Sequence, residues 1–474
     1  MADEYPLLIG EERRKTAEHM KVTSPYNGDI VGIVHKGSKR DIGDAIARAV
    51  KAFEVTRTMP AYQRSDILLK VAQSLRQRRD EVARMICLEA GKAMKESRVE
   101  TDRAVNTFTI AAEEAKRIEG QVIPLDLLPA SAKRLGLTRR FPLGPMAGIS
   151  PFNFPLNLVA HKVAPCIASG NTIVVKPASA TPITALLLGQ MVIEAGMPDA
   201  GISVIPCPGS TGELLVTDER LKKLTFTGSA EVGWYLKGKA GKKKVTLELG
   251  GNAAAVVHTD ADLDFAIPRL VRGSFAYAGQ ICISVQRIFV HQDLFDRFLE
   301  RFVAETETLR RGDPLDEETD LSPMIDEPNA RRVEAWVKEA VQAGASVVTG
   351  GGRDGAYYEP TVLVKTTPVM KVNALEVFAP IVTITPYDRF EEAVRMVNDS
   401  AFGLQAGLFT QDVKRIFYAY DHIDVGGLIV NDVPTYRIDH MPYGGVKDSG
   451  CGREGLRYAI EEMTELKLLA LNLA

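Results

Sequence analysis

The sequence predicts an α/β protein with a parallel sheet, followed by a second α/β unit. From about residue 145, apolar stretches of strand length alternate with stretches of helical pattern, which is typical of strand–helix–strand units. A second alternating series begins at Ala253. The chain has 474 residues, which is enough for two or three domains with large cores.

The first hundred residues are expected to form a cap and then long helices. Apolar residues recur at helical spacing over residues 65–90, and Gly91 is the expected stop of that helix. A second helix is expected from about residue 95 to residue 119, with Gly120 ending it. Residues 121–140 are then strand-like.

The parallel sheet is expected to follow these helices. Ligands on such sheets bind at the carboxyl ends of the strands, where Lys176 and Gly228 fall. Its strands are predicted near 145–149, 172–176, 202–206, 222–226 and 244–248, with helices over 181–195 and 229–240.

The second series places a domain boundary close to Gly250 and Gly251. Glu248 then ends the first unit and Cys282, just before a strand at 285–290, opens the second, so an active site is expected in the crevice between them. The strand-like tail at 464–471 could pair with residues 121–140. Further strands of the second unit are expected at 289–290, 346–348, 381–384 and 428–430.

Composition excludes several classes of partner. The 58 basic and 61 acidic residues leave a net charge of −3, which gives no electrostatic footprint for nucleic acid or for a membrane surface. No apolar run reaches the roughly 20 residues that span a bilayer. The acidic N-terminus lacks a signal-peptide pattern. Five widely spaced cysteines suggest reduced thiols and a cytoplasmic location, and the seven histidines show no metal-ligand spacing.

Cys282 and Glu248 are the candidate catalytic pair. A thiolate is a strong nucleophile, and a glutamate can serve as base for the thiol or for a water molecule. Glycines beside both residues let ligands approach the backbone closely. Most cysteines, however, are small buried hydrophobes, so the pair needs support from other motifs.

Those motifs are present in order along the chain. Together they resemble the NAD(P)-dependent aldehyde dehydrogenase superfamily over essentially the whole sequence, and some segments look most like lactaldehyde and non-phosphorylating glyceraldehyde-3-phosphate dehydrogenases. The motifs are Gly148-Ile149-Ser150-Pro151-Phe152-Asn153-Phe154-Pro155, Val174-Val175-Lys176-Pro177-Ala178-Ser179, Phe226-Thr227-Gly228-Ser229-Ala230-Glu231-Val232-Gly233, Glu248-Leu249-Gly250-Gly251, Gly279-Gln280-Ile281-Cys282, Glu376-Val377-Phe378-Ala379-Pro380 and Pro442-Tyr443-Gly444-Gly445.

The resemblance implies the aldehyde dehydrogenase fold. That fold has a Rossmann-like parallel-sheet cofactor domain, here residues 1–120 and 141–250, and an α/β catalytic domain, here residues 251–455. A small β oligomerisation arm is expected from residues 121–140 and 456–474, in a homodimer or homotetramer.

The resemblance also implies a covalent mechanism. Cys282 attacks the aldehyde carbon, and the Asn153 amide with the Cys282 backbone N–H stabilises the oxyanion. Hydride passes to the nicotinamide and leaves a thioester, which Glu248 hydrolyses by activating water. From the residues alone, Asn153 could be a turn asparagine and Glu248 an exposed strand end.

NAD or NADP is the implied cofactor. A Gly-x-Gly-x-x-Gly fingerprint is missing, but Ser229 at a strand-to-helix junction can hold a pyrophosphate, or can merely cap the helix. Ser179 stands where many NAD-preferring relatives carry a glutamate, so NADP should be tolerated. The implied cofactor residues are Ile149, Lys176, Ser179, Gly228, Ser229, Val232, Gly233, Leu249, Glu376 and Phe378.

The expected substrate is a small, polar aldehyde, either lactaldehyde-like or a short phospho- or oxo-acid aldehyde. Arg103, His161 and Arg437 are its candidate contacts, although a surface salt bridge explains Arg103 equally well. Ile281 stands where the glyceraldehyde-3-phosphate enzymes carry an arginine, which weakens the phosphate interpretation. A coenzyme-A-acylating enzyme and a non-catalytic relative remain as alternatives.

Overall fold

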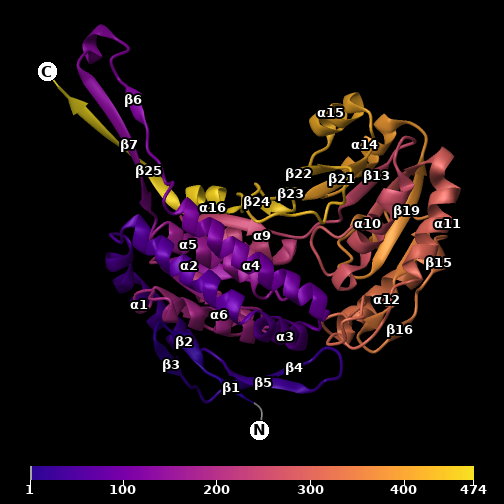
Figure 1. Ribbon diagram of the computed structural model, residues 1–474, viewed down its shortest axis with the longest axis horizontal. Coiled ribbons are helices and arrows are strands. Elements are labelled where there is room, and N and C mark those ends of the chain that lie inside the picture. Colours follow the sequence, from indigo (N-terminus) through magenta and orange to yellow (C-terminus); the bar gives the residue numbers. More distant parts are fainter. Residues whose placement is uncertain (1–2, 474) are drawn as a thin grey trace.

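The computed structural model describes residues 3–473 and is built around two mixed β-sheets (Figure 1). The first sheet has the order β24-β12-β11-β8-β9-β10-β2-β3, and its five central strands are parallel. These strands are β8 (Met146–Ile149), β9 (Ile173–Lys176), β10 (Ile202–Val204), β11 (Lys223–Thr227) and β12 (Lys244–Glu248), with β2 (Leu7–Ile9), β3 (Glu12–Arg14) and β24 (Gly450–Cys451) at the edges.

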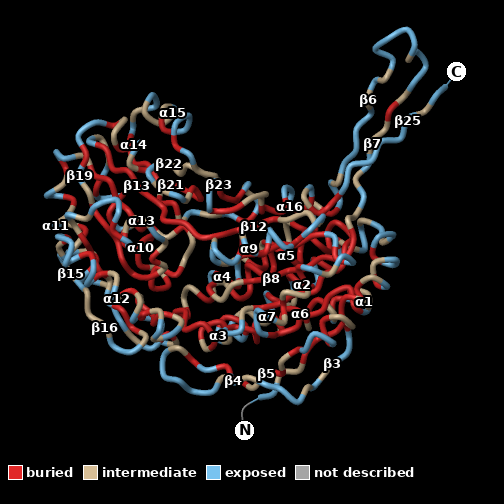
Figure 2. The backbone as a smooth tube through the Cα atoms, turned by 180° about the vertical axis from the view of Figure 1, so that it is seen from behind, coloured by how far each residue is buried: buried red, intermediate tan, exposed pale blue. Residues whose placement is uncertain are grey.

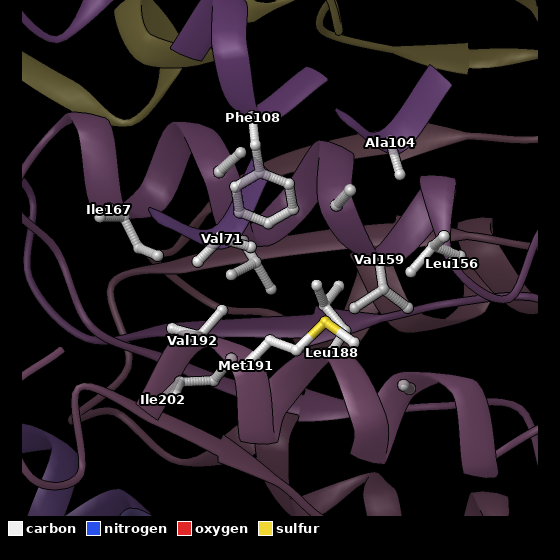
Figure 3. Close-up of a cluster of buried hydrophobic side chains, with 14 of the residues drawn as sticks. Val71, Ala104, Phe108, Leu156, Val159, Ile167, Leu188, Met191, Val192 and Ile202 are labelled. Atoms are coloured by element: carbon white, nitrogen blue, oxygen red, sulfur yellow. The ribbon is translucent and has the colours of Figure 1, made fainter. Parts of the chain in front are cut away.

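Helices cover both faces of the first sheet because its strands are apolar on both sides. In β9, Ile173 and Val175 belong to one core cluster and Val174 belongs to the other. Figure 3 shows part of the first cluster, where Phe108 packs with Val71. That face carries α2 (Ala61–Gln77), α3 (Arg79–Ala90), α4 (Met94–Glu114), α5 (Asn157–Ala168) and α6 (Ile183–Glu194), and the other carries α1 (Lys39–Thr56), α8 (Leu214–Thr217) and α9 (Ala230–Lys239).

The second sheet has the order β15-β18-β19-β14-β13-β21-β22, and only β15 runs antiparallel to its neighbour. Its strands are β13 (Ala254–Val257), β14 (Arg287–His291), β15 (Ser346–Thr349), β18 (Thr361–Val364), β19 (Ile381–Tyr387), β21 (Gln405–Phe409) and β22 (Gly427–Val430). The helices around it are α10 (Leu263–Phe275), α11 (Phe295–Thr306), α12 (Glu327–Gln342), α14 (Phe390–Asn398) and α15 (Val413–His422).

The remaining elements are short. The second part of the chain also holds α13 (Lys371–Ala374), β16 (Arg353–Asp354) with β17 (Tyr357–Tyr358), and β20 (Phe402–Gly403) with β23 (Val446–Lys447). The helix α7 (Gly209–Gly212) follows β10, and α16 (Leu456–Glu462) precedes the last strand. The central strands of the two sheets are buried, whereas the edge strands β3, β15 and β22 are partly exposed (Figure 2).

An arm of three strands projects from the body and carries exposed residues along most of its length (Figures 1 and 2). Its strands are β6 (Val122–Pro124), β7 (Arg134–Pro142) and β25 (Thr464–Asn472), in the order β25-β7-β6. The tail pairs antiparallel with β7 from Thr464 opposite Pro142 to Asn472 opposite Arg134. The pairing between the tail and residues 121–140, predicted from the sequence, is therefore present.

The structure corrects the helices expected before residue 120. The stretch 65–90 is two helices, because Arg78 leaves the helical conformation with φ −103° and ψ 23° between α2 and α3. The next helix, α4, ends at Glu114 rather than at 119. Gly120 is not its stop: a Cβ there would lie 2.0 Å from the Thr138 carbonyl oxygen, so the glycine permits close contact with β7.

The N-terminus also differs from the expected cap. Five strands precede the first helix, and Ser38 begins α1 with a capping box to Asp41. Besides β2 and β3 these strands are β1 (Glu4–Tyr5), β4 (His19–Thr23) and β5 (Ile30–His35). The predicted α/β class is confirmed, whereas the domain limits stay predictions. None of the helices within residues 3–473 has the length and apolar character of a membrane span.

Candidate functional site

Cys282 lies in an irregular segment between the 3₁₀ turn η2 (Ala276–Gly279) and β14. Its sulfur lies 3.1 Å from the Tyr443 hydroxyl. Asn153 lies nearby and donates one amide N–H to the Gln280 carbonyl oxygen at 2.9 Å. The side-chain oxygen of Asn153 is buried without a hydrogen-bond partner. An amide nitrogen has two N–H groups, so one donor remains for a ligand.

The thiol is held in its protonated form by its surroundings. Burial raises the pKa of Cys282 to about 11, and the hydrogen bond from Tyr443 acts in the opposite direction. Arg437 lies over the Tyr443 ring, 3.6 Å from its centroid, and also favours the thiolate. The site thus contains the groups that would stabilise a thiolate, although desolvation outweighs them here.

Glu248 ends β12, and both of its carboxylate oxygens are buried without a hydrogen-bond partner. Burial and the negative charge of Glu454 raise its pKa well above the ordinary value, while Arg437 and Lys162 partly offset this. A carboxylate without partners is costly in a protein interior. Its position is therefore typical of a group that handles a proton or a bound water.

A network of buried charges lies behind Glu248. Lys162 donates to the Thr227 hydroxyl at 2.7 Å and lies 3.4 Å from a Glu454 oxygen. The other Glu454 oxygen accepts a hydrogen bond from Arg437 at 3.0 Å. These cations lower the pKa of Glu454 to about 2, so Glu454 stays ionised and holds up the pKa of Glu248.

A cavity of about 650 Å³ joins these three residues to most of the expected cofactor residues. The lining combines apolar side chains with a few polar groups, as in typical cofactor sites. Cys282, Asn153 and Glu248 line it together with Ile149, Lys176, Gly228, Ser229, Val232, Leu249, Glu376 and Phe378.

The charge of Lys176 fits a nucleotide. Its ammonium group is largely buried and donates to the Pro177 carbonyl oxygen at 3.2 Å, with no carboxylate partner in the described part of the chain. Burial lowers its pKa. Gly212 is needed beside it, because a Cβ there would lie 2.5 Å from the Lys176 side chain. The residues present therefore leave a cation and an open backbone for ribose or phosphate oxygens.

Glu376 completes the other end of the cavity. It accepts a hydrogen bond from the Gly251 N–H at 3.0 Å, and burial raises its pKa to about 7. Gly250 permits this contact, since a Cβ there would lie 2.3 Å from a Glu376 oxygen. Its remaining oxygen can accept from a ribose hydroxyl. Both ends of the cavity thus fit NAD or NADP.

Comparison with known proteins identifies the family. The aldehyde dehydrogenase family model matches residues 12–469. The chain belongs to the aldehyde dehydrogenase family. It is therefore an NAD(P)-dependent oxidoreductase that acts on aldehydes.

Three relatives extend along nearly the whole chain. The 3-sulfolactaldehyde dehydrogenase of Priestia megaterium is 47% identical over 99% of this chain and 98% of its own length. Aldehyde dehydrogenase 21 of Physcomitrella patens, solved with the reaction product succinate, is 43% identical with a TM-score of 0.98, covering 100% of this chain and 99% of that one. A glyceraldehyde-3-phosphate dehydrogenase of Methanocaldococcus jannaschii, solved with NADP, is 38% identical with a TM-score of 0.93, covering 97% and 100%.

Two of the expected cofactor residues lie outside the cavity lining. Ser179 is exposed next to Ala178, which does line the cavity. Gly233 instead packs behind Leu249, which lines the cavity. A Cβ at position 233 would lie 2.3 Å from the Leu249 side chain. Ser229 accepts from the Val232 N–H at 3.5 Å and so also caps α9.

Of the three expected substrate residues, two line a second cavity and the third is buried behind it. Arg103 and Arg437 line this cavity of about 600 Å³, as does Ile281, the neighbour of Cys282. His161 does not line it, because it is buried and bonded to Asp439 at 2.9 Å. Arg103 pairs with the same carboxylate oxygen at 2.7 Å.

Sequence reasoning missed four residues of the site. Tyr443 was visible in the motif Pro442-Tyr443-Gly444-Gly445 but received no role. Glu454 stands in Gly452-Arg453-Glu454-Gly455, and an acidic residue within this glycine-rich segment was the available signal. For Lys162 and Asp439 the sequence holds no signal, because only the fold shows that they are buried.

Replacing Tyr443 by phenylalanine should make the Cys282 thiol harder to ionise. The hydroxyl favours the thiolate, so its loss should move the ionisation midpoint to higher pH and slow alkylation roughly tenfold at about pH 8. The rate of iodoacetamide labelling of the Cys282 peptide, followed by mass spectrometry across pH, measures this. Tyr436→Phe, an exposed tyrosine nearby, is the control; an unchanged Tyr443→Phe profile would contradict the assignment.

Proposed function

We propose that this enzyme oxidises a short aldehyde with a polar or charged far end to the carboxylic acid, through a thioester on Cys282. One observation carries the proposal. Cys282, Glu248 and Asn153 line the same cavity as Lys176 and the other nucleotide-compatible groups. Nucleophile, base and oxyanion donor therefore meet where a hydride acceptor would bind.

The chain's own residues supply the nucleophile, the oxyanion donors and the base for the water. Cys282 attacks as a thiolate, and the free N–H of Asn153 with the backbone N–H of Cys282 stabilises the resulting oxyanion. Bound NAD(P) supplies the hydride acceptor. Glu248, whose pKa is raised by burial and by the negative charge of Glu454, then takes a proton from the water that cleaves the thioester.

Hydrolysis rather than acyl transfer is supported by Glu248. Both of its oxygens are free to bind a water molecule. A coenzyme-A-acylating enzyme would use the same cysteine without this base, so Glu248 separates the alternatives. The nearby ionised Glu454 also maintains the basicity of Glu248 in this role.

The substrate assignment is supported by the second cavity and by the relatives. Arg103 and Arg437 bring positive charge to its wall, and His161 supports Arg103 through their shared partner Asp439. The relatives are named for sulfolactaldehyde and glyceraldehyde-3-phosphate, and one was solved with succinate. All three compounds are short and end in an anion.

Substitution of the two catalytic residues should separate the two half-reactions. Cys282→Ala should lower aldehyde-dependent cofactor reduction at least about a thousand-fold, because no covalent adduct can form. Glu248→Gln should give a burst of one reduced cofactor per site, followed by turnover about a hundred-fold slower than the parent. Rapid-mixing absorbance at the reduced-cofactor band measures both. Parent-like turnover by Cys282→Ala would end the covalent mechanism.

NADP is proposed to be accepted together with NAD. Ser179, the neighbour of the cavity-lining Ala178, carries no negative charge, and Lys176 lines the cavity without a carboxylate partner in the described chain. A 2′-phosphate on the adenosine ribose would therefore meet no repulsion from this side chain.

The five cysteines are free within the described residues, which supports the proposed cytoplasmic location.

A carboxylate at position 179 should penalise NADP selectively. Ser179→Glu should raise the KM for NADP about tenfold or more and leave the KM for NAD within about twofold, because only NADP carries the 2′-phosphate. Ser179→Gln, of the same size but neutral, is the matched control. Steady-state kinetics with each cofactor gives the comparison, and equal changes for both would remove Ser179 from the ribose site.

The arm is proposed to join copies of the chain into a homodimer or homotetramer. β25 has no strand partner on its outer edge among the described residues, and it exposes Leu466, Leu468 and Leu469 by 54–56%. β22, the edge strand of the second sheet, is half-buried and apolar. Exposed apolar edge strands readily pair with another chain.

A charge on the arm should disrupt this assembly. Leu468→Glu should shift the mass in sedimentation toward the monomer, because the carboxylate would be buried at the contact. Val369→Glu, at a residue 87% exposed outside the arm, serves as the control and should leave the mass unchanged. A parent protein that sediments as a monomer would disprove the assembly.

A further inference from the structure

The lining of the cavity beside Ile281 holds more cations than carboxylates. Five cationic side chains line it against three carboxylates, and Asp439 and Glu454 pair with two of these cations from behind the lining. The lining includes Phe154 and Ile281, which follow Asn153 and precede Cys282 in the chain. The charged residues are Lys92, Arg103, Arg269, Arg272 and Arg437, with Glu96, Glu100 and Asp432.

Four of the five cations already have carboxylate partners. The Lys92–Glu100 pair is fully buried, and its ammonium group also lies 3.6 Å from the centroid of the Phe154 ring. A cation that is paired in this way has little remaining capacity for a ligand. The pairs are Lys92–Glu100 at 2.5 Å, Arg103–Asp439 at 2.7 Å, Arg437–Glu454 at 3.0 Å and Arg269–Asp432 at 3.7 Å.

Arg272 is the exception. It lies in the last turn of α10 and is exposed, and its guanidinium group makes no hydrogen bond or ion pair with any residue of the described chain. Its acidic neighbour is Glu96, which accepts a hydrogen bond from the Tyr277 backbone N–H at 3.1 Å instead. All five guanidinium N–H groups of Arg272 therefore remain available for a ligand.

The backbone beside Arg272 is fixed to the segment that follows Cys282. The Gly273 carbonyl oxygen accepts from the Val285 N–H at 3.0 Å and from the Ser284 hydroxyl at 3.2 Å. Gly273 is closely packed, since a Cβ there would lie 3.0 Å from the Val285 side chain. The position of Arg272 relative to the nucleophile is thereby held by the backbone of both segments.

We propose that Arg272 binds the anionic end of the substrate and thereby selects aldehydes that carry a sulfonate, phosphate or carboxylate. The inference deepens the proposed function and rests on it. A planar guanidinium matches two oxygens of such an anion, and a charge-assisted bond in a partly enclosed cavity is stronger than one in water. Arg103, with its carboxylate partner, forms the wall and is not the primary anchor.

Kinetics of Arg272→Met with paired substrates tests the proposal. For succinate semialdehyde and glyceraldehyde-3-phosphate, kcat/KM should fall about ten- to a hundred-fold, mainly through KM. For butanal and lactaldehyde, which carry no charge, the fall should stay within about threefold. Arg272→Lys should recover part of the loss, because it keeps the charge without the fork.

Arg269→Met is the matched control, one helical turn away on α10. Its side chain lines the same cavity but already contacts Asp432 and the Phe265 ring, so charged and uncharged substrates should respond alike. Equal losses for both substrate types in Arg272→Met, or a selective loss in Arg269→Met instead, would overturn the assignment.

Calorimetric titration of succinate separates this inference from the proposed function. If the parent protein oxidised no aldehyde, the proposed function would fail, but succinate binding to the parent would still report on the anion site. Binding should be about ten-fold or more weaker in Arg272→Met than in Arg269→Met. Equal binding by the two variants would reject Arg272 as the anchor, whatever the catalytic result.

Discussion

The site depends on the pairing of β24, near the end of the chain, with β12 of the first sheet. β24 pairs with β12 so that Gly450 lies opposite Glu248, and Gly450 is required because a Cβ there would lie 2.0 Å from the Leu247 carbonyl oxygen. Ser449 donates its hydroxyl to the Gly250 carbonyl oxygen and accepts from the Gly403 N–H. One serine thus ties both halves of the molecule together. The segments on either side of this contact supply Tyr443, beside the nucleophile, and Glu454, behind the base.

Burial of ionisable groups is the energetic consequence of that contact. Desolvation raises the pKa values of Cys282 and Glu248, and the same enclosure keeps Glu454 ionised through its two cationic partners. An isolated charge at a buried position of this kind is unfavourable, because the free-energy cost of desolvation exceeds most of the interactions that stabilise a fold. Paired cations are therefore a requirement of the fold, and the unpaired carboxylate of Glu248 is the group left free to exchange a proton.

The fold class could be predicted from local pattern, and the ordered motifs pointed to the candidate catalytic residues. Alternating strands and helices determine the sheet, and ordered motifs place Asn153 and Cys282 near strand ends that converge on one cavity. The ends of the helices were harder to predict from the sequence. Arg78 breaks a helix without glycine or proline, and Gly120 serves a contact with β7 rather than a helix end. Such features depend on tertiary contacts that no single segment encodes.

Ion pairing explains why the substrate residues were the least predictable part. Arg103 and Arg272 are both arginines within helices, and the sequence alone does not show which of them has an ion-pair partner. Only the fold brings Asp439, from 336 residues away, against Arg103 and leaves Arg272 with no such partner in the described chain. A cation's capacity to bind a ligand is what its protein partners leave unused. Recognition of an anion in this cavity therefore follows from the distribution of carboxylates around it rather than from the number of arginines.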